Sequence, residues 1–146
     1  MGNSSVLGSS PDEITPIRHS NQRRTLTVLN NADETLSTTY AIVIDPLDVE
    51  TYDRVTIQIR NTDTGSISYT TQVFGSLYGA PATVGTAAAA GSHWAQIGDD
   101  ITTSAASGTL KSISTTGLKK LCIRTKSSSG DTLAAGDCIV FLQGTI

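Results

Sequence analysis

The chain has few charged residues, few aromatic rings and no long apolar run. Of its 146 residues, 16% are charged and 5% are aromatic, and the formal net charge is −3 at pH 7. A dedicated nucleic-acid-binding domain carries a strong basic excess, so this charge argues against one. No segment approaches the roughly 20 apolar residues that a membrane span needs. We therefore expect neither a nucleic acid nor a membrane among the partners.

Cysteine is also scarce, since Cys122 and Cys138 are the only two in the chain. Residues 1–10 have neither the basic start nor the apolar run of a secretory signal, so we expect synthesis and retention in the cytoplasm. Thiols are normally kept reduced there. Both cysteines lie in apolar segments, where cysteine often behaves as a small buried hydrophobe. We predict two free, buried thiols; a disulfide is the alternative, and metal binding or catalysis a weaker one.

Motifs for catalysis and for metal binding are missing from the sequence. The two histidines, His19 and His93, have no nucleophile motif beside them, and there is no phosphate loop or dinucleotide fingerprint. Zinc would need clustered cysteine and histidine. The acidic stretch 45–53 lacks the spacing of a calcium loop and predicts a polar turn in which Asp45 and Asp48 bond their own backbone. We therefore expect no enzyme activity, no cofactor and no bound metal.

What the chain does have is threonine and serine, with 22 and 17 residues respectively. Threonine suits strands because its β-branched side chain packs well on a pleated surface. Apolar residues alternate with polar ones over 36–44, 55–59 and 67–73, which is the period of a half-buried strand. We expect Asp45-Pro46 to end the first run, and the other two runs to pair as a hairpin across the turn 61–65.

About eight short strands are expected, separated by turn signals every 8–15 residues. This spacing predicts an all-β fold, an antiparallel β-sandwich or jelly roll, over residues 23–146. The large rings of Tyr69, Phe74 and Trp94 are expected to fill the core rather than form a sugar-binding platform. Tyr78 is the ring that we expect to be exposed. The predicted core consists of the apolar members of the alternating runs, namely Tyr40, Ile42, Val55, Ile57, Ile59, Ile67, Tyr69, Val73, Leu121, Ile123, Ile139 and Phe141.

Residues 1–22 differ in composition from the rest and predict an extended N-terminal arm. The segment is rich in serine and asparagine, and Pro11 and Pro16 disfavour both helix and central strand. One interpretation is a solvated terminus. The other is an arm that binds a partner, because a plain linker would not need spaced apolar anchors or a basic end. The candidate partner-binding residues are Val6, Leu7, Ile14, Ile17, Arg18, Arg23 and Arg24, with His19 among the basic group.

Four segments carry a resemblance to a known class of protein. They are residues 52–61 (YDRVTIQIRN), 69–76, 94–97 (WAQI) and 117–124 (GLKKLCIR). Together they resemble the small β-sandwich decoration, or cement, proteins of tailed bacteriophage capsids, over roughly residue 52 to the end. Similar strand patterns occur in discoidin-like and sugar-binding sandwiches. No site residue of the family can be transferred to this chain.

The resemblance implies a virion structural protein that binds and stabilises the outer surface of the capsid. Its partner would be the major capsid protein, and the implied oligomer is a homotrimer. The place of action would be the exterior of the capsid, after synthesis in the host cytoplasm. Other virion roles, such as a tail or fibre component, stay open at this point. So does a carbohydrate-binding or adhesin module, which glycan binding by a monomer would favour.

The cysteines provide the first testable prediction. Alkylation of the unfolded, unreduced protein should label both Cys122 and Cys138, because a cytoplasmic protein keeps its thiols reduced. Mass spectrometry measures the label. An unlabelled chain that is two protons lighter would instead show a disulfide.

Overall fold

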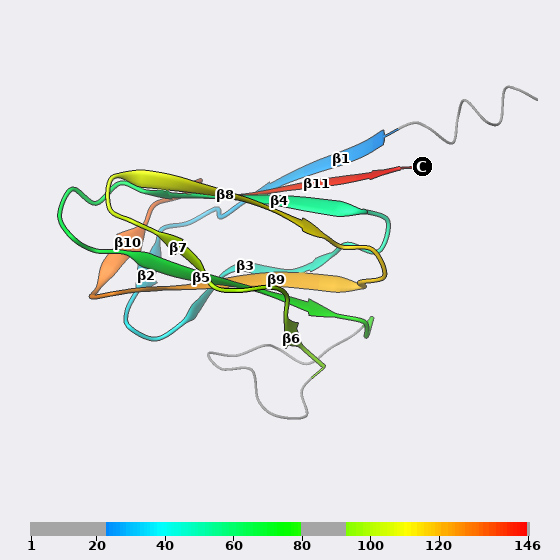
Figure 1. The fold of residues 1–146 in the computed structure, drawn as a ribbon, viewed down its shortest axis with the longest axis horizontal. Coiled ribbons are helices and arrows are strands. Elements are labelled where there is room, and N and C mark those ends of the chain that lie inside the picture. The colour runs from blue at the N-terminus through cyan, green and yellow to red at the C-terminus, as the bar shows by residue number, and fades with distance from the viewer. Residues whose placement is uncertain (1–22, 80–92, 146) are drawn as a thin grey trace, which may run out of the picture.

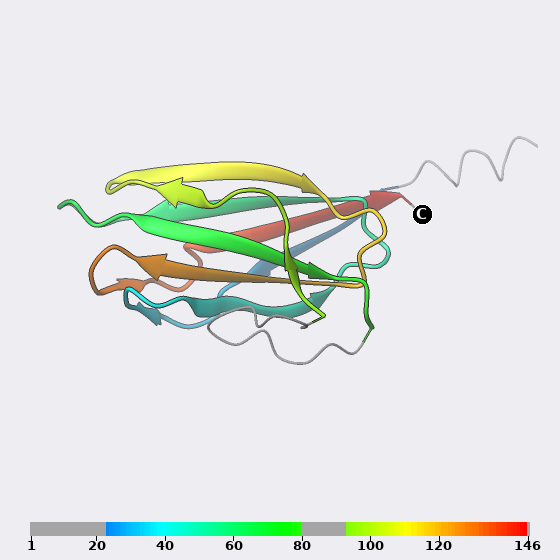
Figure 2. The same ribbon diagram turned by 60° about the horizontal axis from the view of Figure 1, so that its bottom comes forward.

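The computed structural model describes residues 23–79 and 93–145, and these form a two-layered antiparallel β-sandwich (Figures 1 and 2). The described residues contain eleven strands and no helix. The predicted all-β fold class is confirmed. The candidate arm residues Val6, Leu7, Ile14, Ile17 and Arg18 lie outside the described residues, whereas Arg23 and Arg24 open the first strand.

One layer is a four-stranded sheet with the order β1-β11-β4-β8. Its strands are β1 (Arg23–Leu29), β11 (Cys138–Thr145), β4 (Arg54–Asn61) and β8 (Ser107–Ser114). The first and last strands of the chain are therefore neighbours, with Arg23 opposite Thr145 and Leu29 opposite Ile139. All three strand pairs in this sheet are antiparallel.

The other layer is a five-stranded sheet with the order β3-β9-β5-β6, in which β7 also pairs with β5. Its strands are β3 (Ala41–Asp48), β9 (Lys120–Ser127), β5 (Tyr69–Ser76), β6 (Ala95–Gln96) and β7 (Ile101–Thr103). A separate pair, β2 (Glu34–Leu36) with β10 (Asp131–Leu133), lies at one end of the sandwich (Figure 1).

The core lies between the two sheets and is built from alternating side chains. In β4 the buried residues Val55, Ile57 and Ile59 alternate with less buried ones, as the sequence predicts. From the facing sheet, Tyr69 and Val73 are each 1% exposed. The main buried cluster takes in most of the strands, and its members are Leu36, Val43, Ile44, Val49, Val55, Ile57, Ile59, Tyr69, Val73, Ile101, Leu121, Ile123, Leu133, Cys138, Val140 and Leu142.

Both cysteines are free and fully buried, at 0% exposure. Cys138 belongs to the main core, whereas Cys122 lies in a smaller cluster with Phe74 and Trp94. Burial raises the pKa of each thiol to about 12. The thiols therefore stay protonated at neutral pH, which makes them poor nucleophiles.

Five residues of the predicted core are placed differently by the structure. In β11 the inward side chains are Val140 and Leu142, so that Ile139 is only partly buried and Phe141 is 38% exposed. The prediction had the opposite register, because residues 139–142 are all apolar and give no alternation to read. Three more predicted core residues, Tyr40, Ile42 and Ile67, are only partly buried.

Two predictions about strand connections are wrong. The runs that form β4 and β5 do not pair as a hairpin, because β4 belongs to the four-stranded sheet and β5 to the other. The Asp45-Pro46 pair does not end β3, which continues to Asp48. It does disturb the strand, since the register with β9 shifts between Ile42 and Ile44 and again between Ile44 and Leu47. An edge strand tolerates proline because one side has no partner to bond.

The register of β4 can be tested by truncating its inward side chain Ile57, which is 1% exposed. Ile57→Ala should lower the free energy of unfolding by roughly 2–5 kcal/mol, because it leaves a cavity in the core. Denaturant unfolding measures the change. The neighbouring variant Thr56→Ala, on the opposite side of the strand, is the control. A loss below roughly 0.5 kcal/mol for Ile57→Ala is the size expected of a surface site and would contradict this register.

Candidate binding surfaces

The outer side of the five-stranded sheet carries a second small cluster around a buried arginine. Phe74, Trp94 and Cys122 form its apolar part, with Ile42 packed against it. Arg124 is 6% exposed, and its guanidinium carbon lies 4.3 Å from the ring centre of Phe74 and 4.8 Å from that of Tyr40. Stacking on aromatic rings suits a planar, weakly hydrated guanidinium, so that a lysine would not replace it equivalently.

Hydrogen bonds extend from this arginine to a carboxylate. Arg124 donates from Nε and Nη2 to Oε1 of Gln72, at 3.0 and 2.8 Å. Gln72 in turn donates to Asp100 at 2.8 Å. Asp100 also accepts hydrogen bonds from Gln96 at 2.8 Å and from the Tyr40 hydroxyl at 3.4 Å. We call these five residues the Arg124 network.

The network lowers the pKa of Asp100 below its ordinary value, chiefly through the hydrogen bond from Gln72 and also through those from Gln96 and Tyr40. Tyr40 is affected in the opposite direction, because partial burial and the neighbouring Asp100 raise its pKa. This network was not predicted from the sequence. Its members come from separate parts of the chain, and no local motif connects them. We interpret the network as structural, since it holds β5, β6 and β9 together.

A shallow groove of about 560 Å³ lies beside the end of β5. Leu77 and Tyr78 on its wall are 71% and 52% exposed, which confirms the expectation that Tyr78 is exposed. The Tyr78 ring stacks on His93, with ring centres 4.4 Å apart and planes 25° from parallel. Gly75 lies in the lining, where an added Cβ would meet Ile97 Cδ1 at 2.6 Å. We call this surface the Tyr78 groove.

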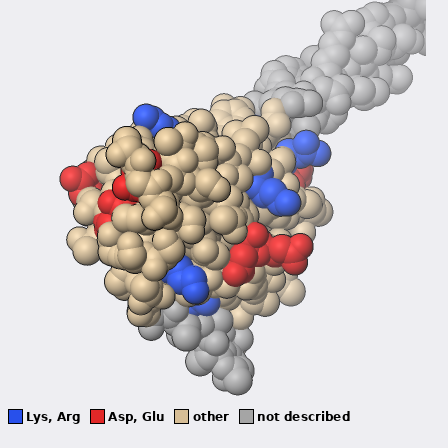
Figure 3. All heavy atoms as spheres, turned by 60° about the vertical axis from the view of Figure 1, so that its left-hand side comes forward, with Lys and Arg blue, Asp and Glu red and all other residues tan. Residues whose placement is uncertain are grey.

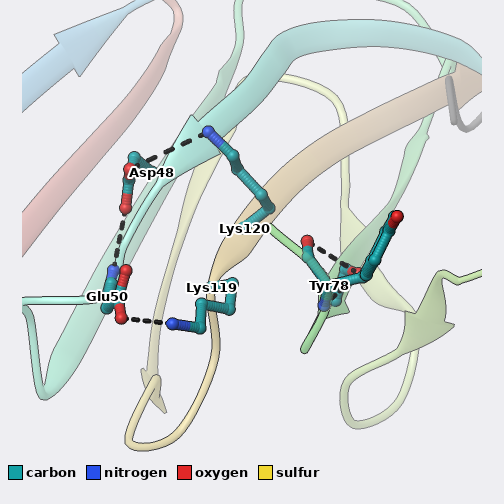
Figure 4. A network of polar contacts seen from close by, with 6 residues as sticks. Asp48, Glu50, Tyr78, Lys119 and Lys120 are labelled. Atoms are coloured by element: carbon teal, nitrogen blue, oxygen red, sulfur yellow. Dashed lines mark hydrogen bonds and ion pairs between the residues drawn. The ribbon is translucent and has the colours of Figure 1, made fainter. Parts of the chain in front are cut away.

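Ion pairs lie near the Tyr78 groove at the same end of the sandwich (Figure 4). Lys119 contacts Glu50, and Lys120 lies 3.8 Å from Asp48. Asp48 also accepts the backbone N–H of Glu50 at 3.1 Å, which confirms the predicted turn for Asp48 but shows no such bond for Asp45. Exposed ion pairs of this kind contribute little to stability, so that they mainly make the rim polar.

A third surface is the outer side of the four-stranded sheet. Strand register aligns Leu29, Ile139, Gln58 and Leu110 in one line across β1, β11, β4 and β8. Leu29 is 45% exposed and Leu110 is 69% exposed, and Phe141 in the next line is 38% exposed. We call Leu29, Ile139, Leu110 and Phe141 the outer apolar row. Figure 3 shows the side of the molecule that is at the left in Figure 1, where acidic and basic side chains form several separate groups among uncharged residues.

Residues that could bind a metal are not gathered anywhere in the described parts of the chain, which hold no cluster of three or more His, Cys, Asp or Glu. Within the same residues, no helix is long and apolar enough to cross a membrane. His93 is part of the Tyr78 stack, and His19 lies outside the described residues.

The Arg124 network predicts a pH dependence of stability. Because the pKa of Asp100 is lowered in the folded state, its contribution is complete above its unfolded value of about 3.9 and is lost as the pH falls through the folded value. Asp100→Asn should therefore flatten the acid side of the stability curve. Urea midpoints between about pH 2 and pH 6 measure this, with Asp99→Asn as the control. Equal acid slopes for Asp100→Asn and the unaltered chain would contradict the assignment.

No protein-family model and no curated protein sequence matches the chain. Among solved structures, it is similar to the SPBc2 prophage-derived protein YomS, with 10% identity, 84% of this chain and 96% of that chain covered, and a TM-score of 0.47. It is also similar to a chain of the infectious bursal disease virus VP2 subviral particle, with 12% identity and a TM-score of 0.49, covering 86% of this chain but only 34% of that one. The disulfide-linked pili of Bacillus endospore appendages show 14% identity over 87% of this chain and 93% of that chain, with a TM-score of 0.40.

Proposed function

We propose that the chain is a structural protein of a bacteriophage virion, and more specifically a decoration protein that binds and stabilises the outer surface of the capsid. The observation that carries the proposal is the outer apolar row on the four-stranded sheet. Aliphatic and aromatic side chains that are exposed together on one face mark protein–protein contact surfaces. The resemblance of residues 52–146 to decoration proteins supports the same assignment.

The contact that we propose joins the outer apolar row to the major capsid protein. The row lies on a rigid sheet whose other side forms the core, so that binding needs no rearrangement of the sandwich. Threonine and serine surround it, with Thr27, Thr56 and Ser112 in line with Phe141. An apolar centre with a hydroxyl-rich margin can exclude water and still form hydrogen bonds at its rim.

The N-terminal residues extend the proposed contact. Val6, Leu7, Ile14, Ile17 and Arg18 would bind along the capsid surface, and the arm joins the sandwich at Arg23, the start of β1. Extended segments with spaced apolar anchors bind by adding backbone hydrogen bonds to a sheet edge and by filling small pockets. The virion exterior is the proposed location.

Co-sedimentation with capsids of the phage that encodes the chain tests this function. Phe141→Ser should weaken binding by roughly tenfold or more, because truncating a buried aromatic at the centre of an interface costs over 1 kcal/mol. Leu77→Ser, an equally simple apolar truncation in the Tyr78 groove, should bind as the unaltered chain does. A protein that does not co-sediment with these capsids is not a decoration protein.

The second candidate function is a carbohydrate-binding module, which the Tyr78 groove favours. An exposed tyrosine can stack on the apolar face of a sugar, and Gln96 supplies polar atoms in the same groove. A glycan array would identify a ligand, and Tyr78→Ala should abolish its binding. Glycan binding that survives Tyr78→Ala would remove the groove from consideration.

A further inference from the structure

Each of the two sheets has two edges, and three of these four edges carry a device that prevents pairing with another strand along their length. In β3 the devices are Pro46 and two register shifts. In β8, Lys111 stands opposite the inward-facing Ile57 and so places a charge on the inner side of the edge. The third of these edges, next to β5, is broken into the short strands β6 and β7. Proline, bulges, inward charges and short strands are the usual protections of exposed edges.

The remaining edge, β1, carries such a device only near its start, where Arg24 lies on the same side of the sheet as the buried Leu142. It pairs with β11 over seven consecutive residues without a register shift. Between Thr25 and Leu29 it contains neither a charge nor a proline. Within the described residues no strand lies on its other side. The uncharged run of residues 25–29 on this free edge is a template for another strand.

The backbone of β1 offers its free groups at alternate residues. Asn30 donates its N–H to the carbonyl of Cys138 at 3.2 Å, and therefore faces β11. Antiparallel pairing alternates along a strand, so that Thr25, Thr27 and Leu29 direct their N–H and C=O groups away from β11. These outward groups can pair with a second strand while the fold of the chain stays unchanged.

We propose that β1 pairs antiparallel with β1 of a second copy of this chain, across a two-fold axis at Leu26. In this register Leu26 faces Leu26 of the second copy, and Thr25 faces its Thr27. Leu26 is on the same side of the sheet as the fully buried Leu142, yet it is 40% exposed, because no strand of the described residues flanks β1 on that edge. The pairing covers this apolar side chain and joins two four-stranded sheets into one.

Charge complementarity supports this register. A groove of about 390 Å³ separates the β1 and β3 edges, and its lining includes Val28, Glu34 and Asp45. When Leu26 faces its own copy, Arg24 stands opposite Val28 of the second copy. Its guanidinium then reaches a groove with two carboxylates, and the contact occurs twice by symmetry. A parallel arrangement of the two β1 strands would instead place the two Arg24 side chains together.

The inference is independent of the proposed function, because it is tested on the purified chain without capsids. Light scattering after size exclusion should show a dimer for the full chain. Thr27→Pro removes an outward N–H at the centre of the edge and should raise the dimer dissociation constant by roughly tenfold or more. Ser112→Pro, in line with Thr27 but on the opposite edge of the same sheet, is the matched control and should leave the dimer unchanged.

A cross-link tests the register directly. Leu26→Cys should form a disulfide-linked dimer on mild oxidation, because Cα atoms in a non-hydrogen-bonded pair lie about 4.5 Å apart, within the range of a disulfide. Leu110→Cys, which is on the opposite edge and more exposed, should stay unlinked. The native Cys122 and Cys138 are fully buried and do not interfere.

The light-scattering and cross-linking results each have an outcome that would overturn the pairing. A monomer, a trimer, or a dimer that persists in Thr27→Pro would each overturn the pairing, and the trimer would agree with the assembly that the resemblance implies. If circular dichroism shows that Thr27→Pro is unfolded, the cross-link decides. Equal linking of Leu26→Cys and Leu110→Cys would reflect random collision and would refute the two-fold register.

Discussion

The structure depends on one constraint, which is that two sheets must bury one face each with few large side chains. Aliphatic residues provide most of the buried surface, and Ile57 and Ile123, for example, are each at most 1% exposed. Aromatic residues are only 5% of the chain. β-Branched side chains suit the purpose because they lose little freedom on a pleated strand. Because these residues fill the space between the sheets, the outer faces of the sheets can carry hydroxyl groups, the Arg124 network and the outer apolar row.

How far the fold follows from the sequence can be judged from β4 and β11. In β4, apolar and polar residues alternate, so that the buried residues Val55, Ile57 and Ile59 were predicted correctly. In β11, residues 139–142 are all apolar, and either face fits the pattern; only pairing with β1 and β4 settles the register. Tertiary packing decides which strands pair with each other. This is why the predicted hairpin of β4 with β5 is wrong.

The candidate surfaces were predictable only in part. Tyr78 was expected to be exposed because glycines flank its segment, and it is. The Arg124 network had one local signal, an arginine directly following the apolar run 121–123, but its partners lie at distant positions of the chain. The free β1 edge is recognisable only once the strand order is known, because β1 itself resembles any other short threonine-rich strand.

The pairing of β1 with β11 has a mechanical consequence. Arg23, where the sandwich begins, stands directly opposite Thr145, where β11 ends, so that both ends of the sandwich leave from the same side. A force that pulls these two ends apart acts across the strand pair rather than along it. Its hydrogen bonds would then break one after another, as in a zipper, instead of resisting together in shear. A force applied between one of these ends and the rest of the sandwich would not unzip the strand pair in this way. The fold would therefore resist it better than a force applied between the two ends.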